Sequence, residues 1–205
     1  MTTRARNSAA LLAIGLMVAA CRAEQGAAGA PAEVDAVTPV AIESCLTDVY
    51  RDRPARDEAF DRAHDAMPGG SLSCGLSITA SELRDTLAEL REAAAAEDRK
   101  RLLGHVGIPM VYIDAQGTVR QLPSMTDIEA FYDDIFTSAV VRRLATLRLE
   151  DASVVPGEGL FFDLGAVWLI VADESGRPQL LTVNHQAAEE AAAAAALEAV
   201  QEDSP

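Results

Sequence analysis

The chain has 205 residues, a formal net charge of −15 and a sequence pI near 4.5, and its length allows one domain with a sizeable core. The acidic balance argues against a main role in gripping nucleic acid and against electrostatic docking on anionic lipid, because both depend on clustered Lys and Arg. Much of the 49% hydrophobic content is alanine in tracts, and aromatic residues make up only 4%. The composition therefore predicts one modest globular domain with Ala-rich ends.

The first twenty residues have the pattern of an export signal. Arg4 and Arg6 precede an apolar run from Ala9 to Ala20. As a helix this run is about 18 Å long at about 1.5 Å per residue, whereas the hydrocarbon core of a bilayer is about 30 Å thick. We therefore interpret residues 1–20 as a signal peptide, which is removed on export, and not as a membrane span.

The signal peptide ends at Val18-Ala19-Ala20-Cys21, which resembles a bacterial lipobox. The resemblance implies that Cys21 becomes the mature N-terminus and carries several acyl chains, which make the membrane anchor stable. An ordinary cleavage site with an incidental cysteine is the alternative. Residue 22 is Arg and not Asp, and by the sorting habit of such lipoproteins this implies the outer membrane, facing the periplasm.

The segment that follows Cys21 is predicted to be a flexible tether. Residues 21–40 are rich in Ala, Gly, Pro and Glu and have no apolar period. Loss of residues 1–20, which contain two arginines and no acid, lowers the net charge from −15 to −17. We expect the tether to keep an acidic folded part clear of the membrane surface.

Two cysteines, Cys45 and Cys74, lie beyond the signal sequence. In a compartment that oxidises thiols an even pair predicts one disulfide. Two free thiols and a metal site are the alternatives, and neither cysteine lies in a C-x-x-C or H-x-x-x-H pattern. Residues 41–78 have a helical apolar pattern that is broken at Pro54 and at residues 68–70. We therefore expect a disulfide-linked helical lead-in.

A longer helix is predicted after the lead-in. Thr79-Ala80-Ser81-Glu82 matches a capping box, in which the first and last residues each accept from the other's backbone N–H. The apolar residues that follow recur at helical spacing against a charged opposite side, and they are Leu83, Leu87, Leu90 and Ala94. Helix tendency continues to about Leu103.

Beyond residue 103 the pattern changes to strands, with one helical stretch between them. Residues 107–113 and 118–122 predict a strand pair around a turn. A second capping box, Thr126-Asp127-Ile128-Glu129, predicts the start of a helix, and a turn can restart at Thr137. Further strands are predicted over residues 153–155, 159–164, 166–171 and 179–183. Residues 187–205 are an Ala/Glu tract, compatible with a fraying helix or a tail.

This order of elements predicts an α+β domain over residues 41–186. Successive strands joined by short turns favour an antiparallel sheet with helices packed on one face. The helix over residues 126–147 carries a stripe of Ile128, Phe131, Tyr132, Ile135 and Phe136, and a Gly-rich, apolar run with a Trp follows it over residues 159–169.

That combination resembles uncharacterised exported bacterial lipoproteins of nuclear-transport-factor-2-like shape. The resemblance covers about residues 98–185 and its motif is structural in character. It implies a curved antiparallel sheet wrapped with helices into a cone, whose mouth holds a pocket in some members and nothing in others. Phe162 departs from the pattern, which has a small residue there, and this puts a tight hairpin in doubt.

The sequence contains no recognisable set of catalytic residues. Of the three histidines, we expect His64 at the surface, His105 in the core or at a rim, and His185 at the end of the last strand. The motifs H-E-x-x-H and G-x-S-x-G are absent, and the Gly-rich turn at residues 157–159 precedes a strand instead of a helix. We therefore predict no catalytic residue, no cofactor and no metal.

Four residues could line a pocket at the mouth of the cone: Tyr112, Asp163, Trp168 and His185. Asp163 lies within an apolar strand near Trp168, and a turn acid that caps a backbone N–H is the alternative. Trp168 is either a core residue or a platform for a ligand. Convergence of Asp163 and His185 on a cavity lined by Tyr112 and Trp168 would favour an enzyme or a ligand-binding protein.

These observations favour a membrane-anchored periplasmic lipoprotein with a non-enzymatic binding or structural role in the cell envelope. The expected partners are the membrane, through the N-terminal lipid, and a protein with a basic surface or a small neutral ligand. No nucleic acid is expected, given the acidic charge. The alternative is a small enzyme of the same shape that uses Asp163 with His185.

Overall fold

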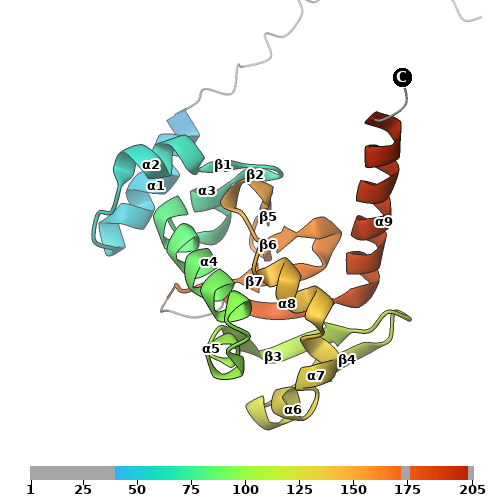
Figure 1. Cartoon of the computed structure of the whole chain (residues 1–205). Helices are drawn as coiled ribbons and strands as arrows, with labels where there is room; N and C mark the ends of the chain where they lie inside the picture. The colour runs from blue at the N-terminus through green and yellow to red at the C-terminus, as the bar shows by residue number, and fades with distance from the viewer. Residues whose placement is uncertain (1–39, 172–175, 203–205) are drawn as a thin grey trace, which may run out of the picture. The chain divides into compact units, whose positions relative to one another are not determined.

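A computed structural model describes residues 40–171 and 176–202, which belong to one compact unit, Thr38–Pro205 (Figure 1). The predicted signal peptide, the predicted lipidation site Cys21 and the tether up to residue 39 lie outside the described residues. In the part of the chain that is described, no helix is both long enough and apolar enough to cross a bilayer.

The first half of the domain is helical with one small hairpin, and the predicted breaks at Pro54 and residues 68–70 fall between its helices. The elements are α1 (Val40–Asp52), α2 (Glu58–His64), β1 (Ala66–Met67), β2 (Gly70–Ser71), α3 (Leu72–Leu76), α4 (Ala80–Ala95) and α5 (Arg99–Leu103). The capping box at the start of α4 is confirmed. The Thr79 hydroxyl accepts from the Glu82 N–H at 3.1 Å, and a Glu82 carboxylate oxygen accepts from the Thr79 N–H at 2.8 Å.

The second half supplies the main sheet and the remaining helices. Its elements are β3 (Val106–Ile113), β4 (Val119–Leu122), α6 (Met125–Ala130), α7 (Tyr132–Ile135), α8 (Ser138–Leu144), the 3-10 turn η1 (Leu149–Asp151), β5 (Ser153–Val155), β6 (Gly159–Phe162), the 3-10 turn η2 (Asp163–Gly165), β7 (Val167–Ile170), β8 (Gln179–Asn184) and α9 (His185–Glu202).

The stretch predicted as a helix over residues 126–147 differs in two ways. Its cap is Ser124, whose hydroxyl accepts from the Asp127 N–H at 3.2 Å, so α6 begins ahead of the predicted box at Thr126. The helix is also divided into three, because the backbone leaves helical geometry at Phe131 and again at Phe136. The predicted restart is confirmed, since the Thr137 hydroxyl accepts from the Val140 N–H at 3.4 Å and caps α8.

The domain is α+β, with a six-stranded sheet in the order β4-β3-β8-β7-β6-β5. The expectation of a wholly antiparallel sheet was wrong at one place, because β3 and β8 are parallel whereas the other neighbours are antiparallel. Parallel neighbours need a long connection. Helices α6–α8 carry the chain from β4 to the far edge at β5, and the meander β5–β8 then returns until its last strand lies beside β3.

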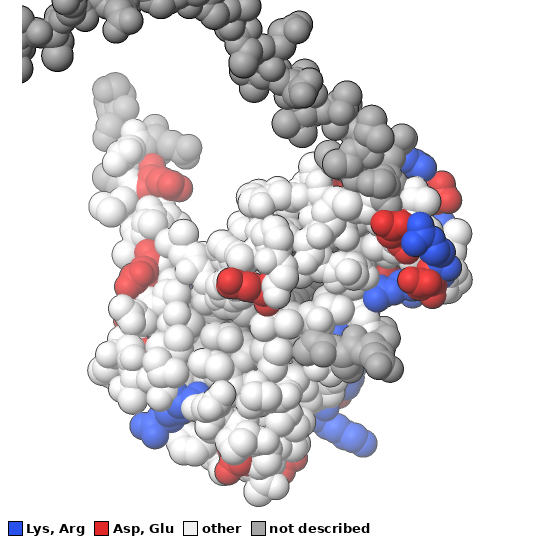
Figure 2. Space-filling model, turned by 180° about the vertical axis from the view of Figure 1, so that it is seen from behind, with Lys and Arg blue, Asp and Glu red and all other residues white. Residues whose placement is uncertain are grey.

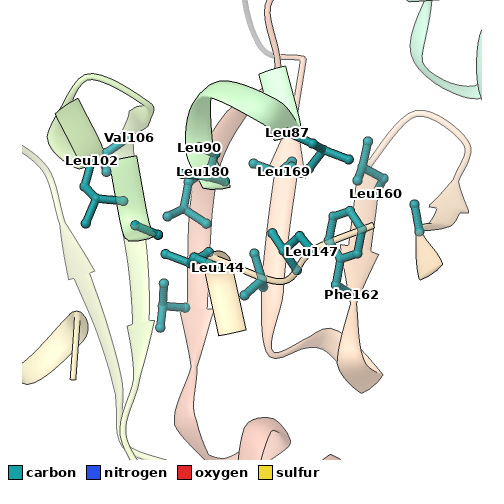
Figure 3. Packing of buried hydrophobic residues seen from close by; sticks show 14 of the residues in the cluster. Leu87, Leu90, Leu102, Val106, Leu144, Leu147, Leu160, Phe162, Leu169 and Leu180 are labelled. Carbon is teal, nitrogen blue, oxygen red and sulfur yellow. The ribbon is translucent and has the colours of Figure 1, made fainter. Parts of the chain in front are cut away.

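One face of the sheet, the core face, packs against α4, α8 and the segment after α8 (Figure 3). The side chains that meet there are all buried: Leu87, Leu90, Leu144, Leu147, Leu160, Phe162, Leu169 and Leu180. Leu83, Leu87, Leu90 and Ala94 of the predicted stripe on α4 are all buried. The core of the domain therefore lies between these helices and the sheet.

The opposite face of the sheet carries a row of residues in register across all six strands. This outer row consists of Gln121, Val111, Thr182, Trp168, Phe161 and Ser153. All of its members except the exposed Gln121 are half-buried. Because successive residues in a strand point to opposite faces, Phe161 lies on this face while its neighbour Phe162 lies in the core.

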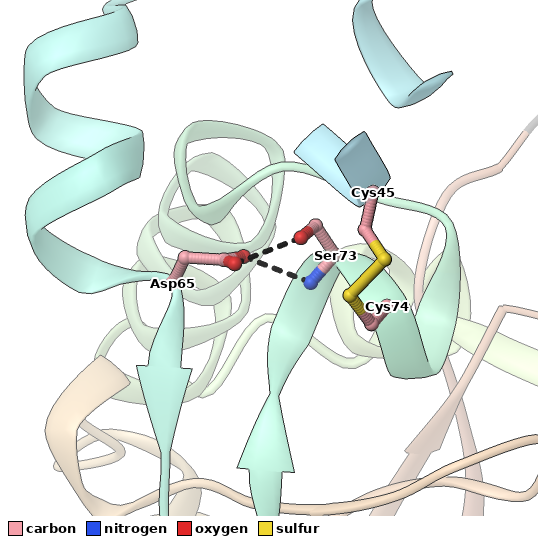
Figure 4. Close-up of a disulfide and its surroundings, with 4 residues drawn as sticks. All are labelled: Cys45, Asp65, Ser73 and Cys74. Carbon is pink, nitrogen blue, oxygen red and sulfur yellow. Dashed lines mark hydrogen bonds between the residues drawn. A yellow bond between two sulfur atoms is a disulfide. The ribbon is translucent and has the colours of Figure 1, made fainter. Parts of the chain in front are cut away.

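A disulfide and a buried carboxylate hold the elements of the lead-in to one another. The predicted Cys45–Cys74 disulfide is present, with a Cα–Cα distance of 5.1 Å (Figure 4). Beside it, the buried Asp65 carboxylate accepts from the Ser73 N–H at 2.9 Å and from the Ser73 hydroxyl at 2.8 Å (Figure 4). Each of these contacts joins segments that are distant in the lead-in.

A second buried carboxylate, Asp61, joins three elements. It accepts from the Tyr50 hydroxyl on α1 and from the Ser81 N–H in the first turn of α4. Burial, and then the hydrogen bond to Asp61, raises the pKa of Tyr50 above its usual value near 10. Tyr50 therefore keeps its proton and remains a donor throughout the neutral range.

Candidate functional site

His185 is the first residue of α9 and its ring is held from two sides. Nε2 lies 3.0 Å from the carbonyl oxygen of Ile135, so this nitrogen carries the proton and donates. The ring also makes an edge-to-face contact with Tyr112, with the centroids 5.3 Å apart. Tyr112 is buried on the core face of β3, and burial raises the pKa of its hydroxyl. His185 is therefore a positioned side chain and not a free surface residue.

Asp163 does not lie in a strand as predicted, because β6 ends at Phe162. Asp163 and Leu164 adopt left-handed φ values of 51° and 57°, which turn the chain out of the sheet into η2. The Asp163 carboxylate lies 2.9 Å from Nη1 of Arg143 on α8. Its partner is therefore a guanidinium of a helix that packs on the core face.

Trp168 lies in the outer row, and its ring is tilted against that of Phe161 with centroids 5.0 Å apart. Tyr112 is in register with Val183, which is in register with Val167 on β7. Because Trp168 follows Val167, it points to the face opposite Tyr112. The four predicted residues therefore do not surround one pocket: Tyr112 and His185 are together, while Trp168 is on the other side of the sheet.

A cleft lies between α8 and the first turns of α9, beside His185. It encloses about 340 Å³, and the residues that line this α8–α9 cleft are Thr137, Ala139, Val140, Arg143, His185, Ala188, Glu189 and Ala192. Small and apolar side chains form most of the wall. Arg143, His185 and Glu189 are the exceptions, and Arg143 links the cleft to Asp163.

Arg143 is the residue that the sequence analysis missed. Its side chain is 21% exposed, and its Nη2 donates to the Ala188 carbonyl oxygen at 3.5 Å. Its buried Nη1 lies within ion-pair distance of Asp163 but makes no hydrogen bond. A signal was present, because position 143 is three residues after the buried Val140 and one before the buried Leu144, so it falls beside the apolar stripe of α8.

The other two histidines lie elsewhere. His64, expected at the surface, is half-buried; its ring stacks on Phe60 with centroids 4.0 Å apart, and its Nδ1 lies 2.9 Å from the Phe60 carbonyl oxygen. His105 lies at the start of β3, and burial, with Arg177 as the next cause, lowers its pKa. Among the described residues no three His, Cys, Asp or Glu side chains are grouped so that they could hold a metal ion.

Charged side chains are distributed unevenly over the surface. Seen from behind, the middle of the molecule carries few of them, whereas they gather over α1 and α2 and, as acids, along α9 (Figure 2). Many cations near α1 and α2 are paired, as Arg53 is with Glu82 at 2.8 Å. Arg143 is likewise paired, with Asp163, and it lines the α8–α9 cleft, most of whose wall is small side chains.

The chain was compared with protein-family models, with curated proteins and with solved structures, and none of the three comparisons finds a match. The case for a function therefore rests on the sequence patterns and on the geometry of the α8–α9 cleft.

Proposed function

We propose that this protein is a lipid-anchored protein of the bacterial cell envelope with a non-enzymatic role, binding a small ligand in the α8–α9 cleft. The observation that carries the binding role is the cleft itself, in which mostly small side chains form the wall together with Arg143, His185 and Glu189. Its volume of about 340 Å³ is at the lower end of the roughly 300–1,000 Å³ of ligand pockets. The ligand is accordingly small.

Two features support the envelope location. The lipobox-like sequence around Cys21, followed by Arg22, favours a lipid anchor at the outer membrane with the domain facing the periplasm. The Cys45–Cys74 disulfide is typical of proteins in oxidising compartments. The membrane is then a partner through the acyl chains, and the acidic chain is not proposed to bind nucleic acid.

The nuclear-transport-factor-2-like shape is part of the same proposal. Its support is the order of elements, in which helices precede the β3–β4 hairpin, helices α6–α8 follow it, and a four-stranded meander completes the sheet. In that shape the space between sheet and helices is where a pocket would be expected. Here leucines and Phe162 fill the space against α4, so the proposal puts the ligand at the α8–α9 corner.

Binding is favoured over catalysis because both members of the expected acid–histidine pair have other partners. The Asp163 carboxylate is paired with Arg143, and His185 uses Nε2 on the Ile135 carbonyl and a ring edge on Tyr112. A general base must reach the proton that it removes. An enzyme that uses Asp163 with His185 would first have to break the ion pair with Arg143.

Filling the cleft tests the binding role. Ala188→Leu places a larger side chain in the cleft, whereas Ala194→Leu adds the same atoms on an exposed and different side of α9. Backbone NMR resonances of α8 and α9 should move when hexanoate, hexanamide or hexylamine is added to the wild type and to Ala194→Leu, and should not move in Ala188→Leu. No movement with any of the three probes, or equal movement in both variants, would contradict the role.

The anchor is tested separately by mass. Wild-type protein from bacterial membranes should carry the mass of its acyl chains on Cys21, and Cys21→Ser should leave an unprocessed or unacylated chain. An intact mass of the wild type without acyl chains would remove the lipoprotein from the proposal. The cleft would be unaffected by that result.

A further inference from the structure

We infer that the α8–α9 cleft selects a short aliphatic monocarboxylate, whose head group binds the guanidinium of Arg143 and whose chain lies against the apolar walls. The inference rests on the proposed function, since it names the ligand class of the same site. The inferred ligand is an anion, whereas the sequence predicted a neutral one, because Arg143 was not among the residues predicted to line a pocket.

Arg143 has donors to spare. A guanidinium carries five N–H donors in a planar fork, a geometry that matches a carboxylate. Nη1 makes no hydrogen bond, and the bond from Nη2 to the Ala188 carbonyl is 3.5 Å, at the outer limit for such a bond. Nη1 is buried beside Asp163, so a planar anion that displaces Asp163 would gain charge-assisted hydrogen bonds that the protein itself does not complete.

The ion pair with Asp163 shows that the guanidinium of Arg143 accepts a carboxylate as its partner. Oδ2 of Asp163 lies 2.9 Å from Nη1, the distance of an ordinary ion pair, yet the two are not aligned for a hydrogen bond. The Asp163 side chain is 41% exposed, so solvent screens the pair and weakens it. An incoming carboxylate would share the guanidinium with Asp163 or displace Asp163 from it. The affinity for the ligand carboxylate would therefore depend on this competition.

The walls limit the rest of the ligand. Ala188 and Ala192 are one turn apart on α9 and, with Ala139 and Val140 on α8, offer an apolar surface with little side-chain bulk. Glu189 also lines the cleft and repels any anion, so a ligand with two negative charges would lose twice to this carboxylate while Arg143 offers a single positive charge. These features favour one negative charge and an apolar chain over a dicarboxylate or a phosphate.

The test uses the full chain in detergent, with hexanoate, its neutral isostere hexanamide and the dicarboxylate adipate as probes in NMR titrations. Hexanoate should bind at least 10-fold more tightly than hexanamide or adipate. Arg143→Gln should remove this preference and leave hexanamide binding unchanged. The matched control Arg142→Gln removes the same charge from the neighbouring residue of α8, which does not line the cleft, and should change hexanoate binding less than 2-fold.

Asp163→Asn should change hexanoate binding in the direction opposite to Arg143→Gln. It therefore distinguishes an effect on binding from an effect on folding. Removal of the competing carboxylate should tighten hexanoate binding several-fold and leave hexanamide unchanged, a gain that a damaged fold cannot produce. Equal binding of hexanoate and hexanamide, or weaker hexanoate binding in Asp163→Asn, would overturn the carboxylate while leaving the cleft as a binding site. Absence of any resonance shift in α8 and α9 with all probes would overturn the proposed function as well.

Discussion

The lead-in, residues 41–78, and the sheet with α4 and α8 are held by different means. Apolar packing of leucines and Phe162 holds the sheet to its helices. The lead-in contributes Leu72, Leu76 and Ile78 to the same core, but a disulfide and the Asp65–Ser73 contact also hold its own elements together, and Asp61 joins it to α4. The difference teaches that a short helical segment with few apolar side chains is stabilised by covalent and polar bonds in addition to packing.

The largest expected effect is in the apolar region. Phe162→Ala removes a buried ring from the core face and should lower the free energy of unfolding by about 3–5 kcal/mol, through lost burial and the cavity left behind. Phe161→Ala is the matched control, because it deletes the same side chain from the half-buried outer row and should lower it by less than about 2 kcal/mol. Urea denaturation of both variants measures the difference, and equal losses would contradict the assignment of faces.

The second largest effect on stability is expected when the disulfide of the lead-in is removed. The bridge closes a loop of 29 residues, so the double variant Cys45→Ser with Cys74→Ser should lose about 3–4 kcal/mol on the chain-entropy account. Amide hydrogen exchange should rise in α1 and α3 more than in β6–β8. Uniform exchange across the domain would show that the lead-in and the sheet unfold as one unit.

Substitution of Tyr50 tests the hydrogen bond between α1 and the buried Asp61. Tyr50→Phe deprives the buried Asp61 of a donor and should lower the free energy of unfolding by about 1–3 kcal/mol at neutral pH. Tyr132→Phe, a half-buried tyrosine of α7 outside the lead-in, is the control and should cost less than about 1 kcal/mol.

The pH dependence of the same pair has a definite sign. The pKa of Tyr50 is raised in the folded state, first by burial and then by Asp61, so the unfolded chain releases this proton at lower pH than the folded one. The contribution of protonated Tyr50 to the free energy of unfolding is therefore complete below about pH 10 and is lost as the pH rises above that value. Stability of the wild type should fall above pH 10, and Tyr50→Phe should reduce the slope. An unchanged slope would contradict the role of Tyr50.

Much of this fold follows from sequence patterns, and the exceptions share a physical cause. Leu83, Leu87 and Leu90 repeat at helical spacing, and the capping box at Thr79 marks where their helix begins, so α4 could be placed from the sequence. The burial of Asp61 and Asp65 could not be predicted, because aspartate is almost never fully buried without partners. Their partners lie on other elements, and only the folded structure brings them together.

The candidate site was predictable only in fragments for the same reason. His185 and Tyr112 do meet, but Asp163 leaves its strand and joins Arg143 instead. The parallel pairing of β3 with β8 decides which residues of distant segments share a face, and no local pattern reports it. Trp168 was therefore assigned to the pocket although its strand register puts it on the outer face.

The smallest expected effect concerns the cap of α6, which belongs neither to the lead-in nor to the packing of the sheet against α4 and α8. Ser124 caps α6 with its hydroxyl on the Asp127 N–H, so Ser124→Ala should lower the free energy of unfolding by about 1 kcal/mol. Thr126, which the sequence favoured as the cap, lies inside the helix, and Thr126→Ala should change stability by no more than about 0.5 kcal/mol. Urea denaturation of the two variants decides between the caps. A larger loss for Thr126→Ala than for Ser124→Ala would instead place the cap of α6 at Thr126, as the sequence predicts.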